Sequence, residues 1–571
     1  MNIMSIMKNF SGYLQRTILF FSLVLILNTN LLGQARSDFE IAKNIEIFTT
    51  LYKTLNINYV DDLNHGELFE TAIESMLESL DPYTNYIPEA QREDYLFMTT
   101  GQYGGIGALI QQRDGYVIVS EPYEGAPAQK AGLIAGDRIT EINGKSTGGR
   151  SVSDVSAILK GQPGTQLEVL VQRQGIEEPI LFKITRENVK IQDVPYSGIL
   201  EKDIAYINLS GFTQTASADV KKAFEDLRSQ TDLKGLIIDL RGNGGGLLSE
   251  AVNIVGMFVP RGETVVSTRG KLRASNNVHK TSATPKDPDI PIAILVDGGS
   301  ASASEIVAGA LQDLDRAVVI GQRTIGKGLV QNVIPLVYNT NLKVTVAKYY
   351  IPSGRCIQAI DYFHKDENGD HIVIPDSLKT AFTTRNGRTV YESAGIEPDI
   401  TIEPRSIGNI TRALINRHMI FDFASHFYLN NKEIAPADEF EISDQIFEEF
   451  KAYVADNKLE YQTASERSLR QLKQRVEEEK HSDRVSALLI ELQTEIDRSK
   501  ENDFSTFSEE IREILLAEIV SRYYFQRGRV ISMLPRDNTV KKAIEILHDT
   551  DQYKQIISNT GQTQTNDKGK G

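Results

Sequence analysis

The sequence predicts a multidomain α/β protein in which a small β-rich module and a larger α/β core lie between helical N- and C-terminal regions. At 571 residues the chain is too long for one hydrophobic core, since single cores rarely grow beyond about 250–300 residues. Short β-rich runs separated by glycine-containing turns occupy residues 100–188. Residues 190–405 then alternate apolar strands with helices, which is typical of a parallel sheet covered by helices.

The composition is typical of a globular protein and argues against a nucleic-acid binder. Hydrophobic residues make up 40% of the chain and charged residues 24%, which are ordinary proportions. The formal net charge is −15 at pH 7, whereas nucleic-acid-binding domains are usually basic. The single cysteine, Cys356, excludes an intramolecular disulfide. We expect Cys356 to be a buried structural residue, because no histidine lies beside it in the sequence.

Residues 1–35 have the pattern of an export signal. Lys8 and Arg16 precede an apolar run at residues 17–27, and the small residues Gly33 and Ala35 follow it. The run is short for a transmembrane helix, although an uncleaved membrane anchor is the alternative. We therefore expect an exported protein of the periplasm or cell envelope.

Several familiar catalytic and cofactor motifs are missing from the sequence. It contains no His-Glu-x-x-His, no Gly-x-Ser-x-Gly and no GxxxxGK[ST] loop. The segment 364–371, HKDENGDH, is more typical of a polar turn than of a metal site, because it lacks the spacing of a calcium loop. We expect neither a metal nor another cofactor.

A serine-rich segment, residues 297–305, lies where a buried strand meets an amphipathic helix. Free amides and the helix dipole at such a junction favour a developing negative charge. Serines are also common helix caps. The segment alone therefore leaves open whether Ser300, Ser302 and Ser304 are caps or include a nucleophile.

Two further loops follow apolar strands of the same predicted core. Because adjacent parallel strands end at one edge of a sheet, the glycines of residues 240–246 could reach the serine segment and form an oxyanion hole, or simply make a tight turn. In residues 324–331, Lys327 has uncharged neighbours, which suits a general base if burial lowers its pKa. By spacing alone, Lys327 could equally be a solvated surface charge, and Gln331 could orient its amine.

These loops resemble the carboxyl-terminal processing (tail-specific) proteases of the Ser-Lys type. The resemblance covers about residues 40–405 and is carried by six ordered motifs: SLDPYTNYI (79–87), IDLRGNGGGLL (238–248), GGSASASEIVAGALQD, GKGLVQ, YYIPSGRCIQ (349–358) and AGIEPDI (394–400). Three segments of the β-rich module are similar to a PDZ domain: GGIGALI (104–110), residues 124–145 and the predicted helix 152–159. The resemblance implies a ClpP/crotonase-like α/β protease core.

The residue patterns and this resemblance together give the expected order of domains. It comprises a signal peptide (1–35), an N-terminal helical domain (38–97), a PDZ domain (100–188), the Ser-Lys protease core (190–405), a helical C-terminal extension (406–557) and a disordered tail (558–571). The extension is longer than the minimal family architecture. It could mediate dimerisation, dock a partner, present substrate, or simply pack on the core as a scaffold.

The resemblance also implies a role for individual residues of the protease core. Ser302 would be the nucleophile, Lys327 its general base and Gln331 the residue that positions the lysine. Two groups would surround this dyad: an oxyanion hole formed by Ala303 with Gly245 or Gly246, and supporting acidic residues at Glu305 and Asp313.

In the PDZ domain, one loop would bind the carboxylate of a substrate tail through its amides: Gly104, Gly105, Ile106 and Gly107. We therefore expect a serine endopeptidase acting on proteins or peptides with a free C-terminus. An adaptor or activator protein and a homo-oligomer could accompany it, and no nucleic acid is expected. A catalytically inactive PDZ adaptor or chaperone on the same scaffold is the alternative, and a serine hydrolase of esters or small amides is the third reading.

Overall fold

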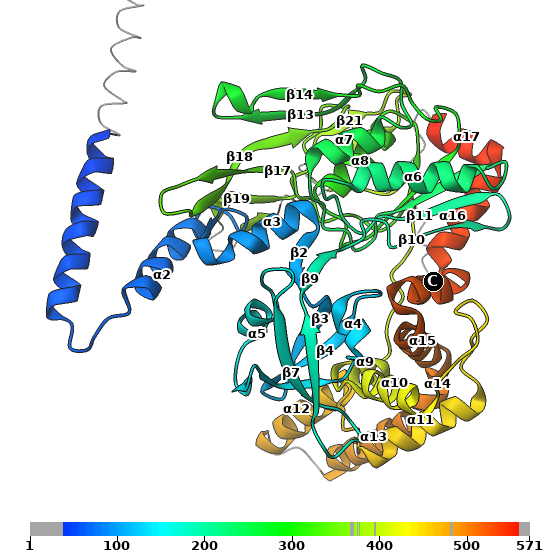
Figure 1. Cartoon of the computed structure of the whole chain (residues 1–571). Helices are drawn as coiled ribbons and strands as arrows, with labels where there is room; N and C mark the ends of the chain where they lie inside the picture. Colours follow the sequence, from blue (N-terminus) through cyan, green and yellow to red (C-terminus); the bar gives the residue numbers. More distant parts are fainter. Residues whose placement is uncertain are drawn as a thin grey trace, which may run out of the picture. The chain divides into compact units, whose positions relative to one another are not determined.

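The computed structural model describes residues 38–365, 371–373, 375, 377, 379–392, 395–479 and 483–558 (Figure 1). The predicted signal peptide and nearly all of the predicted disordered tail lie outside the described residues. The chain divides into two compact units, of which the second begins at Leu80. Within the described residues, every helix is too short or too polar to cross a membrane.

The first unit contains a helix at residues 38–58 and helix α2 (His65–Glu78). Asn64 caps α2, because its side chain accepts a hydrogen bond from the Glu67 amide. Apolar side chains of the first helix face solvent, and Ile45 is 61% exposed. Both helices lie within residues 38–97, the region that the sequence predicted to be helical.

One part of the predicted N-terminal helical domain is a strand, so the prediction of helix was wrong there. Residues Asn85–Ile87 form β1, which pairs antiparallel with β18 (Asn341–Tyr350). Helix α3 (Arg92–Thr100) then follows. The pairing partner of β1 is distant in sequence, so local periodicity could not indicate this strand.

The β-rich module has a core sheet in the order β3-β4-β5-β7-β8. Its strands are β3 (Ala108–Arg113), β4 (Tyr116–Pro122), β5 (Arg138–Ile142), β7 (Gln166–Gln172) and β8 (Ile180–Thr185). Helices α4 (Pro127–Ala131) and α5 (Val152–Leu159) complete it, and α5 begins with a capping box between Ser151 and Asp154. At the two ends of the module's sequence, β2 (Gln102–Gly105) pairs antiparallel with β9 (Glu187–Lys190).

The α/β core is a six-stranded sheet in the order β10-β11-β12-β15-β16-β23. Only β10 (Tyr196–Leu200) runs antiparallel to its neighbour. The parallel strands are β11 (Ile204–Asn208), β12 (Gly235–Asp239), β15 (Ile292–Val296), β16 (Val318–Gly321) and β23 (Ile400–Thr401). The predicted parallel α/β arrangement of residues 190–405 is therefore present.

Helices cover both faces of this sheet. On one face, Ile238 and Ile294 pack with α6 (Ala216–Arg228), α7 (Leu248–Val255) and α8 (Ala303–Asp313). On the other face, Ile237 and Leu295 pack with α16 (Asn538–His548) and α17 (Thr550–Ser558), the red helices of Figure 1. The last helices of the C-terminal extension are thus the second cover of the core sheet.

The preceding part of the extension is a helical bundle with its own apolar core. The helices that form this core are α9 (Asn409–Asn416), α10 (Met419–Asn430), α11 (Asp444–Asp456), α14 (Asp503–Thr506) and α15 (Ser508–Met533). Helices α12 (Ala464–Glu478) and α13 (Asp483–Glu501) pack together through a small apolar cluster of their own. Two ion pairs join the helical bundle to the β-rich module: Arg113 with Asp422 at 2.5 Å, and Arg529 with Glu121 at 2.7 Å.

Candidate active site

Ser302 lies at the junction of β15 and α8, at the carboxyl edge of the core sheet. It immediately precedes the first residue of α8 and has φ 56° and ψ −111°. A positive φ is unfavourable for a residue with a side chain and commonly marks a functional position. Ser302 is also partly exposed to solvent. The hydroxyl of Ser302 is therefore reachable from solvent at a strained position of the backbone.

The neighbouring serines have structural roles. Both are fully buried, and their hydroxyls donate to carbonyls of the glycine-rich loop: Ser300 to Leu240 at 2.8 Å, and Ser304 to Asn243 at 2.8 Å. These bonds hold the serine segment against the loop 240–246. Of the three serines, Ser302 alone presents its side chain to solvent.

The glycine-rich loop packs directly against Ser302. A Cβ at Gly245 would lie 2.8 Å from the Ser302 Cβ and 2.9 Å from the Ala303 nitrogen, so only glycine fits there. The Gly245 amide donates to Asn243 Oδ1 at 2.9 Å in this conformation. The Ala303 amide is the first of α8 and has no acceptor within the helix. Gly246 lies instead against Phe212, whose carbonyl oxygen would be 2.4 Å from a Cβ at Gly246.

Glu305 links the serine segment to the lysine loop. It is fully buried on the first turn of α8. Its carboxylate accepts four hydrogen bonds, three from backbone amides and one from a hydroxyl: Ser302 N at 2.8 Å, Gly326 N at 2.7 Å, Lys327 N at 2.9 Å and Thr324 Oγ1 at 2.5 Å. Burial raises the pKa of Glu305, and the four hydrogen bonds oppose that rise.

Lys327 follows β16, in a loop that the Glu305 carboxylate holds beside Ser302. Burial lowers the pKa of Lys327, and the charge of Lys343 lowers it further. The carboxylates of Glu305 and Asp81 act in the opposite direction. Within the described residues there is no hydrogen bond between Lys327 Nζ and Ser302 Oγ, and Nζ lies instead 4.2 Å from the ring centroid of Tyr83.

Gln331 lies on β17 (Leu329–Pro335), and in the described part of the chain it makes no hydrogen bond to the lysine amine. Its amide nitrogen donates to the Leu329 carbonyl at 3.2 Å and to Thr345 Oγ1 at 3.4 Å. The structure thus brings Ser302, Ala303, Gly245 and the Lys327 backbone together, and leaves Gln331 on the adjacent strand.

Tyr349 is a site residue to which the sequence reasoning assigned no role. This buried β18 residue donates its hydroxyl to the Lys327 carbonyl. Burial raises the pKa of Tyr349 well above its ordinary value, and a side-chain hydrogen bond with Ser302 opposes that rise. The residue opens the motif at 349–358, so the motif marked its position without revealing its contacts.

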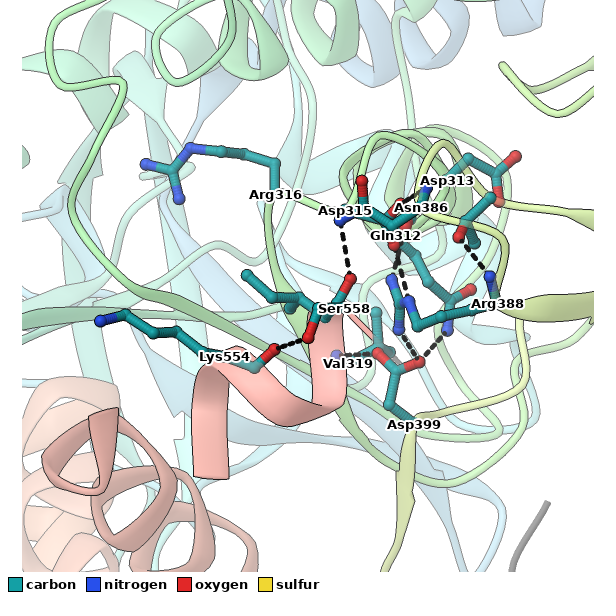
Figure 2. Close-up of polar contacts among 12 residues, drawn as sticks. Gln312, Asp313, Asp315, Arg316, Val319, Asn386, Arg388, Asp399, Lys554 and Ser558 are labelled. Atoms are coloured by element: carbon teal, nitrogen blue, oxygen red, sulfur yellow. Dashed lines mark hydrogen bonds and ion pairs between the residues drawn. The ribbon is translucent and has the colours of Figure 1, made fainter. Parts of the chain in front are cut away.

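Asp313 lies at the opposite end of α8 from Ser302. It is buried and accepts from Arg355 Nη2 at 2.9 Å and from the Ser353 amide at 2.9 Å. Beside it, Arg388 pairs with Asp315 at 2.6 Å and with Asp399 at 2.5 Å (Figure 2). This network anchors the C-terminal end of α8. Within the described residues, the Asp313 carboxylate bonds Arg355 and Ser353 and not the dyad, so Asp313 supports the helix.

The predicted carboxylate loop, Gly104–Gly107, already has internal partners. The Ile106 carbonyl accepts from the Ala128 amide at 2.7 Å, and Gly107 has φ +73°. Burial raises the pKa of Tyr103 to about 12, while hydrogen bonds from the amides of Ala108 and Gly107 oppose the rise. Of these two amides, that of Gly107 belongs to the loop that was expected to hold a peptide carboxylate.

The segment 364–371 is described only at its ends. His364 pairs with Asp361 at 2.7 Å, and residues 366–370 lie outside the described part. Among the described residues, no group of three or more His, Cys, Asp or Glu side chains is placed to hold a metal ion. Cys356 is buried as predicted, and burial raises the pKa of its thiol.

Comparison with known families divides the chain into three matched regions. Residues 203–365 match peptidase family S41, residues 118–173 match the PDZ domain, and residues 410–547 match the C-terminal helical domain of a probable PDZ-protease. The S41 region contains Ser302, Lys327 and the glycine-rich loop. The helical bundle is therefore part of a recognised PDZ-protease arrangement.

Curated relatives that align with more than half of the chain include two proteases. The carboxy-terminal-processing protease of Bartonella bacilliformis is 38% identical over 355 residues, which are 60% of this chain and 81% of the relative. A probable CtpA-like serine protease of Staphylococcus aureus is 34% identical over 340 residues, 58% of this chain and 66% of the relative.

Solved structures similar to the chain include a photosystem II D1 C-terminal processing protease. It is 27% identical, covers 62% of this chain and 92% of its own, and has a TM-score of 0.34. The PDZ domain of a carboxy-terminal protease from Vibrio cholerae, solved in complex with peptide, is 29% identical. It covers 16% of this chain and 99% of its own, with a TM-score of 0.15.

Proposed function

The chain belongs to the carboxy-terminal-processing proteases of peptidase family S41, and from that premise we propose that Ser302 is its nucleophile and Lys327 its general base. The chain is a serine endopeptidase of the C-terminal processing type with a PDZ domain. The fold class expected from the sequence, a PDZ domain and a protease core with a helical C-terminal region, is confirmed. The inactive-adaptor alternative is not favoured by these relatives.

One observation carries the assignment of the dyad. Glu305 accepts hydrogen bonds from the backbone amides of both Ser302 and Lys327, at 2.8 and 2.9 Å. A single buried carboxylate therefore holds the serine and the lysine on adjacent loops. Ser300 and Ser304 are buried and bonded elsewhere, so neither competes with Ser302 as a nucleophile.

The proposed reaction is acyl transfer. Neutral Lys327 takes the proton from Ser302 Oγ, and the alkoxide attacks the peptide carbonyl carbon. The resulting oxyanion accepts hydrogen bonds from the amides of Ala303 and Gly245, the latter exchanging its Asn243 acceptor for the oxyanion. The lysine ammonium then protonates the leaving amine, and water hydrolyses the acyl-enzyme with regeneration of Ser302.

We further propose that the PDZ domain binds substrates by a free C-terminal carboxylate, at the amides of the loop Gly104–Gly107. Support comes from the backbone-amide chemistry of such loops and from the peptide present in the Vibrio cholerae PDZ structure. Export to the periplasm or cell envelope, an adaptor protein and a homo-oligomer are part of the same proposal. Fractionation of cells that express the full chain tests the localisation.

Cleavage by single variants tests the dyad. Ser302→Ala and Lys327→Ala should each lower the rate of peptide cleavage by at least about 10³-fold, because members of a catalytic set act as a unit. Ser249→Ala, at an exposed position of α7, is the matched control and should cleave normally. Normal cleavage by Lys327→Ala at neutral pH would reject the dyad. Ester turnover without any peptide cleavage would instead support the third reading, a different serine hydrolase.

A further inference from the structure

The Lys327 ammonium group lies on an aromatic ring in this structure. Its Nζ is 4.2 Å from the ring centroid of Tyr83, inside the roughly 6 Å over which a ring face attracts a cation. Among the described residues, Nζ makes no hydrogen bond and no ion pair that would compete with this contact. The amine is therefore held by the Tyr83 ring and not by the Ser302 hydroxyl.

The Tyr83 ring is fixed by a turn that Asp81 closes. The amides of Tyr83 and Thr84 donate to Asp81 Oδ1 at 2.8 and 2.9 Å. The Thr84 hydroxyl accepts from the Thr345 amide at 3.2 Å, which ties the turn to β18. At its outer end, the Tyr83 hydroxyl lies 3.3 Å from that of Tyr362. The ring is thus held from both ends, independently of the lysine.

Charged groups from three elements act on Lys327. Lys343 on β18 lowers its pKa, as burial does, whereas Glu305 on α8 and Asp81 in the turn raise it. The π face of Tyr83 acts in the same direction as Glu305 and Asp81, because it stabilises the ammonium form of Lys327 and not the neutral amine. A base must be neutral to accept the serine proton, so this contact opposes catalysis while it lasts.

We propose that Tyr83 is a positioning residue that holds the protonated Lys327 away from Ser302, and that the lysine must leave this ring to act as a base. The inference rests on the proposed roles of Ser302 and Lys327. It extends the site to the turn before β1, which the sequence placed in a helical domain outside the protease core. The contact with the Tyr83 ring determines the fraction of protein molecules in which the Lys327 amine lies beside Ser302.

The test is the pH dependence of Ser302 labelling by a small fluorophosphonate probe, which does not depend on capture of a peptide by the PDZ domain. The acid limb is the range in which the labelling rate rises with pH. In Tyr83→Leu this limb should move to lower pH by roughly half a unit, which corresponds to about 0.7 kcal/mol. Tyr83→Phe keeps the ring and loses only the hydroxyl, so its acid limb should not move. Tyr86→Leu, in the strand β1 that follows the turn, is the matched control and should also retain the wild-type limb.

Three outcomes would overturn the proposal. The first is an unchanged acid limb in a Tyr83→Leu protein that unfolds at the wild-type temperature. The second is an equal shift in Tyr83→Phe, which would assign the effect to the hydroxyl. The third outcome applies if Tyr83→Leu does not fold. The pKa of Lys327 is then measured in Tyr83→Trp by NMR of ¹³C-labelled lysine, and a pKa no higher than that of the wild type would overturn the proposal. Wild-type labelling of Lys327→Ala would reject the dyad instead, so the two failures are distinguishable.

Discussion

Replacement of Glu305 by glutamine tests whether one buried carboxylate holds the site together. All four of its hydrogen-bond partners are donors, and they are shared between its two oxygens. Glu305→Gln has nearly the same shape, but its NH₂ group must replace one of the two oxygens. When it replaces Oε1, the Thr324 hydroxyl can accept from it and only the Gly326 amide loses its acceptor. A buried donor left without an acceptor costs about 1–3 kcal/mol, so the free energy of unfolding should fall by about 1–3 kcal/mol.

The assay combines thermal unfolding with fluorophosphonate labelling of Ser302. Glu305→Gln should unfold at a lower temperature and label more slowly even where it is fully folded, because either the Gly326 amide beside Lys327 or the amides of Ser302 and Lys327 lose their acceptor. Glu250→Gln is the matched control. Glu250 is also a buried glutamate in the first turn of a helix, but it accepts only one backbone amide, that of Ser217 at 2.9 Å. Wild-type stability and labelling in Glu305→Gln would refute this reasoning.

Two further predictions concern the PDZ loop and the C-terminal helices. Tyr103→Phe removes the hydroxyl from the amides of Gly107 and Ala108, so a peptide with a free C-terminus should bind about fivefold more tightly, from one competing hydrogen bond of about 1 kcal/mol. Fluorescence polarisation measures this, with the amidated peptide as control, and an unchanged affinity would contradict it. A chain ending at Asp537 lacks α16 and α17, which exposes the face of the core sheet that carries Ile237 and Leu295. It should bind a hydrophobic dye and lose cooperative unfolding, and a soluble, active truncated protein would show that the cover is dispensable.

The pH dependence of labelling in the wild-type enzyme follows from the lowered pKa of Lys327. The unfolded-state pKa of a lysine is 10.5, and in the folded protein it is lower because of burial. Labelling should therefore rise with pH through a value below 10.5. Stability should also rise with pH between the folded and unfolded pKa, since there the unfolded chain binds more protons. The same acid limb is the reference for the Tyr83 variants.

Much of the fold could be predicted because it depends on local patterns. Alternating apolar strands and helices indicated the parallel core, and glycine-punctuated β runs indicated the module at residues 100–188. The strand β1 could not be predicted, because its stability comes from pairing with β18. Likewise, the sequence predicted a helical extension over residues 406–557, but it carried no information on which surface its last helices, α16 and α17, cover.

The candidate site divides in the same way. The sequence by itself determined that Ser302, Lys327 and the glycine-rich loop follow strands of one sheet, because motifs and strand order are local or sequential properties. Only the tertiary structure decided three contacts. Glu305 accepts hydrogen bonds from the amides of both Ser302 and Lys327, the Tyr349 hydroxyl donates to the Lys327 carbonyl, and the Lys327 amine contacts the Tyr83 ring. Those contacts join segments far apart along the chain, and their geometry depends on strand pairing and burial that no local pattern encodes.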